Sequence, residues 1–310
     1  MALLARKKLL LAKIETTYGT DSTPTGAANA IQTSNFQITP LDGPTTSRNL
    51  DSPYLGNDVQ IQVGSYVTVT FDVEFAGSGS GVDEVPAYGP LLEACGFDET
   101  VVVSTNVIYS PSNSDFESLT MYAHLDGQLH SITGARGSVA MSLSPGGIPQ
   151  FSFTFMGLFN TPSSDTDPTP VFTAFATPVP VNNTNTTTAT LHGETLVLRG
   201  LSLDVGNEVA YQNVVNSEAV DIIDRAVSGS ISFDAPAISD KDWFTTAINS
   251  TTGNLTFTHG TTAGNIVTVT GPATQVISPT YGEASGIRTI EASLSLINGS
   301  GSNDIVITTS

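Results

Sequence analysis

The stretch QLHSITGARGSVAMS, from Gln128 to Ser142, has a counterpart much later in the chain, NIVTVTGPATQVISP, from Asn265 to Pro279. Gly134 aligns with Gly271, and at the same offset Ile132, Thr133 and Val139 align with Val269, Thr270 and Val276. Both stretches mix β-branched with small polar residues, as β-strands do. A chain that carries one β-segment twice is predicted to contain a duplicated unit.

Further blocks repeat in the same order. The segment Ile31–Thr39 corresponds to Leu196–Asp204, and Val67–Asp72 corresponds to Gly229–Asp234. A short amphipathic stretch follows in each copy, and in the first copy it predicts a helix at Leu91–Phe97. Because strands share a small vocabulary, one matching block is weak evidence. Four blocks in one order indicate two copies of a domain with loops inserted.

This repeat divides the chain into four parts. We predict an N-terminal arm (1–30), a first domain (31–160), an extended linker rich in Pro, Thr and Asn (161–190), and a second domain (191–310). The first domain also carries an insertion, 98–118, to which the sequence assigns no role.

The predicted strands alternate between apolar and polar residues. In Val67–Phe75 the valines and phenylalanines fall on one face, and Thr, Asp and Glu fall on the other. Phe151–Phe155 and Ile290–Leu296 alternate in the same way, and Asp126-Gly127 between two such runs predicts a tight hairpin turn. The predicted fold is mostly β: two tandem β-sandwich or barrel-like domains, each with a short flanking helix, a dry face and a wet face.

Charge is distributed unevenly along the chain. There are 29 acidic and 10 basic residues, and four of the basic ones, Arg6, Lys7, Lys8 and Lys13, lie at the start. The remainder is strongly acidic and is repelled by phosphates and by anionic membranes, which excludes a conventional nucleic-acid binder. No apolar run is long enough for a membrane span, and the basic start is too short for a signal peptide. We therefore expect a cytosolic chain.

No residue pattern predicts catalysis. His124 and His130 flank the Asp126 turn, but these groups do not complete a metal coordination shell. The one cysteine, Cys95, lies in the predicted helix and is expected to be a small buried hydrophobe. No serine occupies a nucleophile elbow, and no spacing isolates an acid–base pair of carboxylates. We expect no enzymatic activity, metal or cofactor.

Three stretches, taken together and in order, resemble the tail tube proteins (major tail proteins) of long-tailed bacteriophages with non-contractile tails. They are Arg6–Ile31, Ala123–Gly157 and Pro279–Leu296. None is a chemical signature, so the resemblance rests on their order. Many members of that family have one tube domain per chain, whereas this chain has two copies.

The resemblance implies a structural virion protein. In the family, sheets of neighbouring domains line a channel, rings stack into the tail tube, and DNA leaves through it. Two domains per chain then imply a homotrimeric ring with pseudo-sixfold symmetry. The implied partners are further copies, the tail terminator, tape measure and tail tip proteins, and DNA in passage without specific binding. No membrane is involved, and assembly takes place in the host cytoplasm.

Two sets of candidate residues follow. Negative charge keeps DNA from adhering, so the wet face is expected to line the channel. The lumen-facing candidates are Thr68, Thr70, Asp72, Glu74, Ser230, Ser232, Asp234 and Glu291. The arm has an apolar face if helical and no local core, so it is expected to contact another ring, unless it is a frayed terminus. The arm candidates are Leu3, Arg6, Lys7, Lys8, Leu10 and Ile14, with Leu4 and Leu11 on the same face.

Two other classes remain open. An extracellular adhesin or surface protein of tandem Ig-like domains suits the Thr- and Asn-rich composition, but the missing signal peptide and the basic, apolar arm argue against it. A phage tail-tip or capsid decoration protein has a similar composition and ends at one ring or a surface lattice. Electron microscopy of the purified protein separates tubes or rings from single elongated particles.

Overall fold

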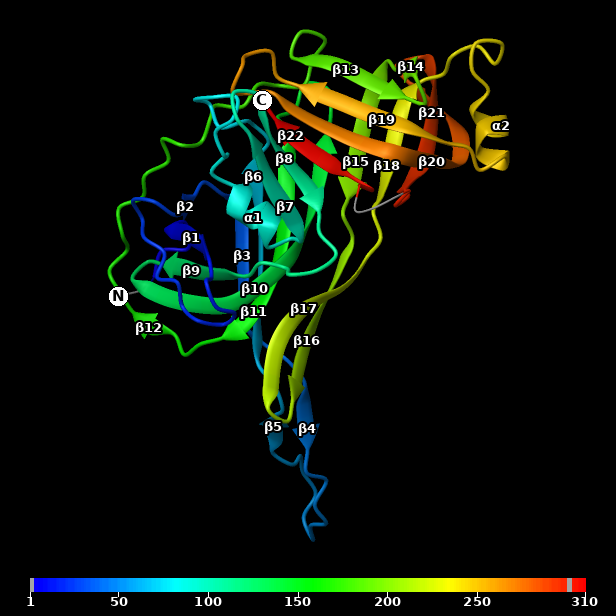
Figure 1. Cartoon of the computed structure of the whole chain (residues 1–310). Helices are drawn as coiled ribbons and strands as arrows, with labels where there is room; N and C mark the ends of the chain where they lie inside the picture. Colours follow the sequence, from blue (N-terminus) through cyan, green and yellow to red (C-terminus); the bar gives the residue numbers. More distant parts are fainter. Residues whose placement is uncertain (1–2, 300–302) are drawn as a thin grey trace.

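The computed structural model describes residues 3–299 and 303–310 and shows a molecule made almost entirely of β-strands (Figure 1). Within these residues there are two helices, α1 (Gly89–Glu93) and α2 (Trp243–Ile248), and neither is long enough to cross a membrane. The prediction of a mostly β, sandwich-like fold with short helices is confirmed. The first two residues of the predicted arm lie outside the described residues.

Eight antiparallel strands form one continuous sheet in the order β3-β6-β11-β10-β15-β18-β21-β20. The first four come from the first half of the chain and the last four from the second. In both sets the last strand in space precedes its neighbour along the chain, so the two halves have the same strand order. The halves join where Ala140–Leu143 pairs with Leu201–Asp204. The domain boundaries themselves stay a prediction. The strands are β3 Ser34–Asp42, β6 Tyr66–Glu74, β10 Gln128–Leu143, β11 Gln150–Phe159, β15 Leu198–Asp204, β18 Ser228–Asp234, β20 Val267–Ala284 and β21 Ile287–Leu296.

A second layer covers the apolar face of this sheet. The long strands β10 and β20 pass from one layer to the other, and their pairings shift register on the way, at Thr133/Arg136 in β10. The pairings among the described strands form an open, branched network, so the closed form of the expected barrel-like domains is absent there. The remaining strands of this layer are β1 Lys8–Ile14, β2 Ala30–Ile31, β7 Phe97–Val102, β8 Asn106–Pro111, β9 Leu119–Leu125, β12 Ser163–Ser164, β13 Thr186–Leu191, β14 Glu194–Thr195, β19 Thr252–His259 and β22 Val306–Thr309.

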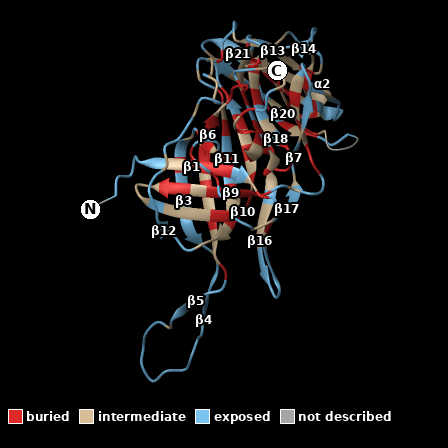
Figure 2. Cartoon of the chain, turned by 60° about the vertical axis from the view of Figure 1, so that its left-hand side comes forward, coloured by how far each residue is buried: buried red, intermediate tan, exposed pale blue. Residues whose placement is uncertain are grey.

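The core lies between the layers and follows the predicted alternation (Figure 2). On β6 the odd-numbered residues from Val67 to Val73 are buried, and the even-numbered ones are partly exposed. Phe71 stacks on Phe153, with ring centroids 5.5 Å apart, and Phe153 stacks on Phe155 at 5.9 Å. Each such buried ring contributes about 1.5–3 kcal/mol of apolar burial. The turn at Asp126-Gly127 is also as predicted, since both residues have positive φ.

The insertion 98–118 joins the two halves a second time. Its strand β8 pairs with the C-terminal strand β22, with Tyr109 opposite Ile307. Strand β22 in turn pairs with β20 of the second half. The halves are therefore connected by strand pairing in both layers, through β10–β15 in one and β8–β22 in the other.

The arm, considered above as a possible helix, contains a strand. Residues 8–14 form strand β1, which pairs along its whole length with β9. The short Leu-rich run suits a buried strand as well as a helix, and the available partner strand decides between them. After β1 the chain is held by Glu15, whose buried carboxylate accepts hydrogen bonds from the backbone N–H groups of Gly19 and Gly134 and from the hydroxyls of Ser118 and Thr120.

Replacing Glu15 with Ala should destabilise the protein by about 2–4 kcal/mol, because buried donors lose their acceptor. Denaturant unfolding measures this loss, and hydrogen exchange should show faster exchange at the amides of Gly19 and Gly134. The exposed Glu84→Ala is the control and should change stability by no more than about 0.5 kcal/mol. Equal stability of the two variants would contradict the role of Glu15.

Helix α1 carries an acidic group in an unfavourable place. Burial, followed by the nearby carboxylates of Glu99, Glu117 and Asp98, raises the pKa of Glu93 to about 7. A carboxyl whose pKa is raised on folding favours the folded state at low pH. That contribution is lost as pH rises from the ordinary carboxyl range through about 7.

Replacing Glu93 with Gln removes the charge and keeps the shape. The variant should be more stable than the wild type at pH 8, by about 1–2 kcal/mol once solvent screening is allowed for, and the gain should disappear near pH 4.5. Thermal unfolding across this pH range measures the difference, with the exposed Glu84→Gln as control. A gain that does not depend on pH would refute the assigned cause.

Candidate functional site

The polar face of the eight-stranded sheet brings the predicted lumen residues together. Strand register carries one row across the joint between the halves: Glu74, Gln150, Ser142, Ser202, Ser230 and Ser293 lie opposite one another in turn. Thr68, Thr70 and Asp72 share the face of Glu74 on β6. Ser232 and Asp234 share that of Ser230 on β18, with Glu291 opposite Ser232. All eight candidates therefore lie on one face.

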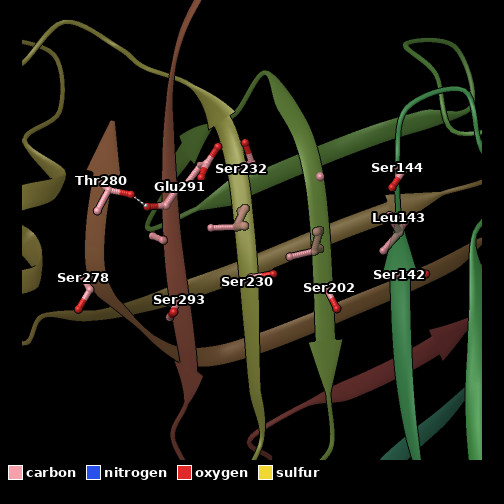
Figure 3. Close-up of a pocket in the computed structure, with 14 residues that line it drawn as sticks. Ser142, Leu143, Ser144, Ser202, Ser230, Ser232, Ser278, Thr280, Glu291 and Ser293 are labelled. Atoms are coloured by element: carbon pink, nitrogen blue, oxygen red, sulfur yellow. Dashed lines mark hydrogen bonds between the residues drawn. The ribbon is translucent and has the colours of Figure 1, made fainter. Parts of the chain in front are cut away.

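Hydroxyl groups dominate the middle of this face (Figure 3). A shallow, open hollow of about 460 Å³ spans β10, β15, β18, β21 and β20, and half of the residues around it are serines. Ser142, Ser202, Ser230 and Ser293 are all exposed. A serine hydroxyl both donates and accepts hydrogen bonds and carries no charge. This surface is therefore well hydrated but does not bind ions tightly.

The acidic groups on this face are partly compensated. Asp72 accepts hydrogen bonds from the hydroxyl of Ser152 and from the amide of Asn35. Asp234 accepts two from the guanidinium of Arg199, at 2.7 and 3.1 Å. This pair could not be predicted from the sequence, because Arg199 reaches Asp234 only through the register of β15 and β18. The face is acidic, but less so than the sequence of its strands suggested.

Both ends of the eight-stranded sheet are unpaired edges. Strand β3 pairs only with β6, and beyond Gln275 the strand β20 pairs only with β21 among the described residues. Unpaired strand edges expose backbone donors and acceptors that can pair with another chain. Inside the chain, β10 and β15 show how one half pairs with the next. Sequence reasoning did not locate these edges.

Two hairpins project from one end of the molecule (Figure 1). The hairpin of β4 (Thr45–Ser47) and β5 (Gln60–Gln62) carries an exposed loop, 48–59, in which the side chain of Tyr54 is 83% exposed. The hairpin of β16 (Asn207–Val214) and β17 (Ser217–Arg225) lies against its base, where the rings of Tyr66 and Tyr211 are 5.1 Å apart. The exposed apolar residues at the two ends are Leu50, Tyr54, Leu55, Val59, Val214 and Val215.

A family model described as phage tail tube protein matches residues 5–296, nearly the whole chain. The chain belongs to the phage tail tube protein family. The resemblance found in the sequence is thereby confirmed. A comparison with curated proteins gave no match. As a family member, this tail tube protein is a structural component of the virion tail. It assembles with further copies of itself into a tube. Such proteins are generally not enzymes, and nothing found supports the adhesin alternative.

In this tail tube protein the arm candidates have separate positions. Leu3, Arg6, Lys7 and Lys8 are exposed, whereas Leu10 is buried against β9 and Ile14 packs on the core. Leu10 is therefore part of its own half and, in this conformation, is not available to another ring. Lys7 forms a 2.8 Å ion pair with Asp126 of the β9–β10 hairpin, and Lys8 donates a hydrogen bond to the carbonyl oxygen of Phe36 on β3.

The histidines of the tail tube protein do not gather into a site. Burial lowers the pKa values of His124 and His130 and so favours their neutral forms. Asp167 from the segment between the halves lies 3.9 Å from His124. Within the described residues, no group of three or more His, Cys, Asp or Glu side chains is placed to hold a metal ion.

Proposed function

We propose that three copies of the chain close into a ring, in which β3 of one copy pairs with the free part of β20 of the next. The observation that carries this proposal is the pair of open edges at opposite ends of one sheet. The β10–β15 pairing inside the chain supplies the template, because it joins the same two kinds of strand. Three chains of eight strands give a channel wall of roughly 24 strands without edges.

The channel of this ring conducts DNA during ejection. Its wall is the polar face that carries the eight lumen candidates, with hydroxyl groups in the middle and an excess of carboxylates. Phosphates are repelled by this charge, and the described strands of the wall carry no row of Lys or Arg that could bind them. DNA passes along the wall and is not bound by it.

Rings stack through the projecting hairpins and the exposed part of the arm. The tips of the β4–β5 and β16–β17 hairpins present apolar side chains to solvent at one end of the molecule. Burying apolar groups of this size against the next ring stabilises the stack. Leu3 and Arg6 at the start of the arm add contacts in the same stack. At the ends of the tube, the tail terminator and the tail tip proteins meet these surfaces, and the tape measure protein occupies the channel during assembly in the host cytoplasm.

The ring proposal predicts a definite mass. Native mass spectrometry of detached rings should give three chains per ring, and images averaged from above should show six similar lobes that alternate between two kinds. Six chains per ring would refute the proposal.

The stacking proposal predicts that rings form but tubes do not when the loop loses its apolar tip. Tyr54→Ser with Leu55→Ser should leave rings intact and reduce tube length at least tenfold in negative-stain images. Removing residues 1–7 should shorten tubes as well. Val103→Ser is the control, because this exposed valine lies on the β7–β8 hairpin and not on either projecting tip. Tubes of normal length from the loop variant would contradict the proposed contact.

The channel proposal predicts slower DNA ejection when the wall is made cationic. Glu74→Lys with Glu291→Lys changes two acidic groups on this face that form no ion pair with any described residue. Asp72 and Asp234 are less suitable because they hold Ser152 and Arg199. Tubes should form, and ejection measured by dye release should slow at least several-fold at low salt and recover at high salt. The control is Glu84→Lys with Glu194→Lys, away from the face, and equal ejection rates of the two pairs would count against an electrostatic role.

A further inference from the structure

The groove between α1 and β10 is filled from within the chain. The corner between β15 and β16 enters it, and there Val205 is fully buried and donates its backbone N–H to the carbonyl oxygen of Val139. The side-chain amide of Asn207 donates to the carbonyl oxygens of Cys95, at 2.6 Å, and Gly137, at 3.0 Å. The second half of the chain is thus fixed to the first by a corner in a groove, beside the strand pairing itself.

The corresponding groove in the second half is open. It lies between α2 and β20 and has a volume of about 380 Å³. Phe244, Ala247 and Ile248 line it from α2, and Val276 and Ile277 line it from β20. Ile248 is 81% exposed. No described residue occupies this groove, so a largely apolar surface lies directly beside the free edge of β20.

The first half carries a related corner between β3 and β4, which is one residue shorter because no residue stands between Asp42 and Gly43. In it the carboxylate of Asp42 accepts a hydrogen bond from the N–H of Gly43, as the carboxylate of Asp204 does from Gly206 in the second half. Both glycines have positive φ, and a Cβ on either would collide with a carbonyl oxygen of the returning chain. The two corners are therefore built on the same backbone constraint.

The side chains of the two corners differ in exposure. Val205 and Ile222 around the second corner are buried inside the chain. Around the first corner, Leu41, Ile61 and Val63 are 55%, 45% and 56% exposed. The described part of the chain thus has a filled groove beside α1, an empty groove beside α2, a buried corner after β15 and an exposed corner after β3.

We propose that the β3–β4 corner of one copy fills the groove between α2 and β20 of the next copy, burying Leu41, Ile61 and Val63 against Phe244, Ile248 and Ile277. The occupant is a second copy of this chain, because only the empty groove and the free corner repeat a contact already made inside the chain. This inference rests on the proposed ring and adds to it the surface that selects the partner.

The corner contact selects the register and the partner, which strand pairing alone does not. Backbone hydrogen bonds between two edges are nearly independent of sequence, so the edges alone permit slipped registers and wrong partners. A side-chain corner seated in a groove permits one register of β3 on β20. After Gly43 comes Pro44, where the second corner has Asn207 after Gly206, so the contact between copies lacks the amide hydrogen bonds of the internal joint. It depends on apolar burial, which suits a joint made during assembly.

Crosslinking between copies tests the contact. In the variant with Val63→Cys and Ile248→Cys, a short bismaleimide applied to assembled rings should give covalent dimers and trimers on a denaturing gel. The native Cys95 is fully buried and contributes little background. Either single substitution should give no covalent trimer, and Val63→Cys with Val103→Cys, which replaces the groove position by a distant exposed one, should not crosslink either.

A charge in the groove provides a second test. Ile248→Asp should raise the protein concentration needed for ring formation at least tenfold, without changing the unfolding temperature of the monomer. Ile238→Asp, which is exposed and outside the groove, should assemble as the wild type does. Intact rings without the Val63–Ile248 crosslink, or normal assembly of Ile248→Asp, overturn the corner contact and leave the ring standing. A wild-type protein that forms no rings at all overturns the proposed function itself.

Discussion

The structure depends on the hydrogen-bonding capacity of strand edges. A β-sheet that ends in solvent leaves a row of backbone donors and acceptors without partners, and such a row attracts other strands. In this protein one potential pair of edges is closed internally, where β10 meets β15, and the other pair is left open as β3 and the free part of β20. The continuity of the eight-stranded sheet and the edges that it presents to another chain both follow from how these edges are paired.

The internal joint is reinforced well beyond the four residue pairs that β10 and β15 share. Val205 and Asn207 fix the corner beside α1, and Arg136 bonds to Asp221 of the β16–β17 hairpin at 2.6 Å. In the other layer β8 and β22 add a further strand pairing. An ion pair between the partly buried Arg225 and the buried Asp304 lies close to this second joint. These contacts fix the angle between the halves, and that angle sets the curvature that a closed wall of such sheets can have.

Local patterns in the sequence predicted the local structure. The alternation in Val67–Phe75 located strand β6 and its buried face, and Asp126-Gly127 located the turn between β9 and β10. The helix beside each half was also found, although α1 is shorter than the predicted Leu91–Phe97 and begins earlier. Contacts between distant segments were not predictable. Nothing near residue 109 indicates that β8 pairs with the C-terminal strand, and the ion pair of Arg199 and Asp234 depends on a register that no single strand reveals. The two corners could have been found in the sequence, because each carries a similar motif. The motif is Leu-Asp-Gly at 41–43 in the first half and Leu-Asp-Val-Gly at 203–206 in the second.

The two hairpins at the projecting end are unequal. The β4–β5 hairpin has a long, irregular loop, whereas the β16–β17 hairpin is longer in its strands and closes with a tight turn. A ring of six identical domains would look the same after every sixth of a rotation. In the proposed trimer the unequal hairpins alternate, so the ring looks the same only after each third of a full rotation. In such a trimer, a contact between unlike hairpins of stacked rings has half as many equivalent angular settings as it would have between rings of six identical domains.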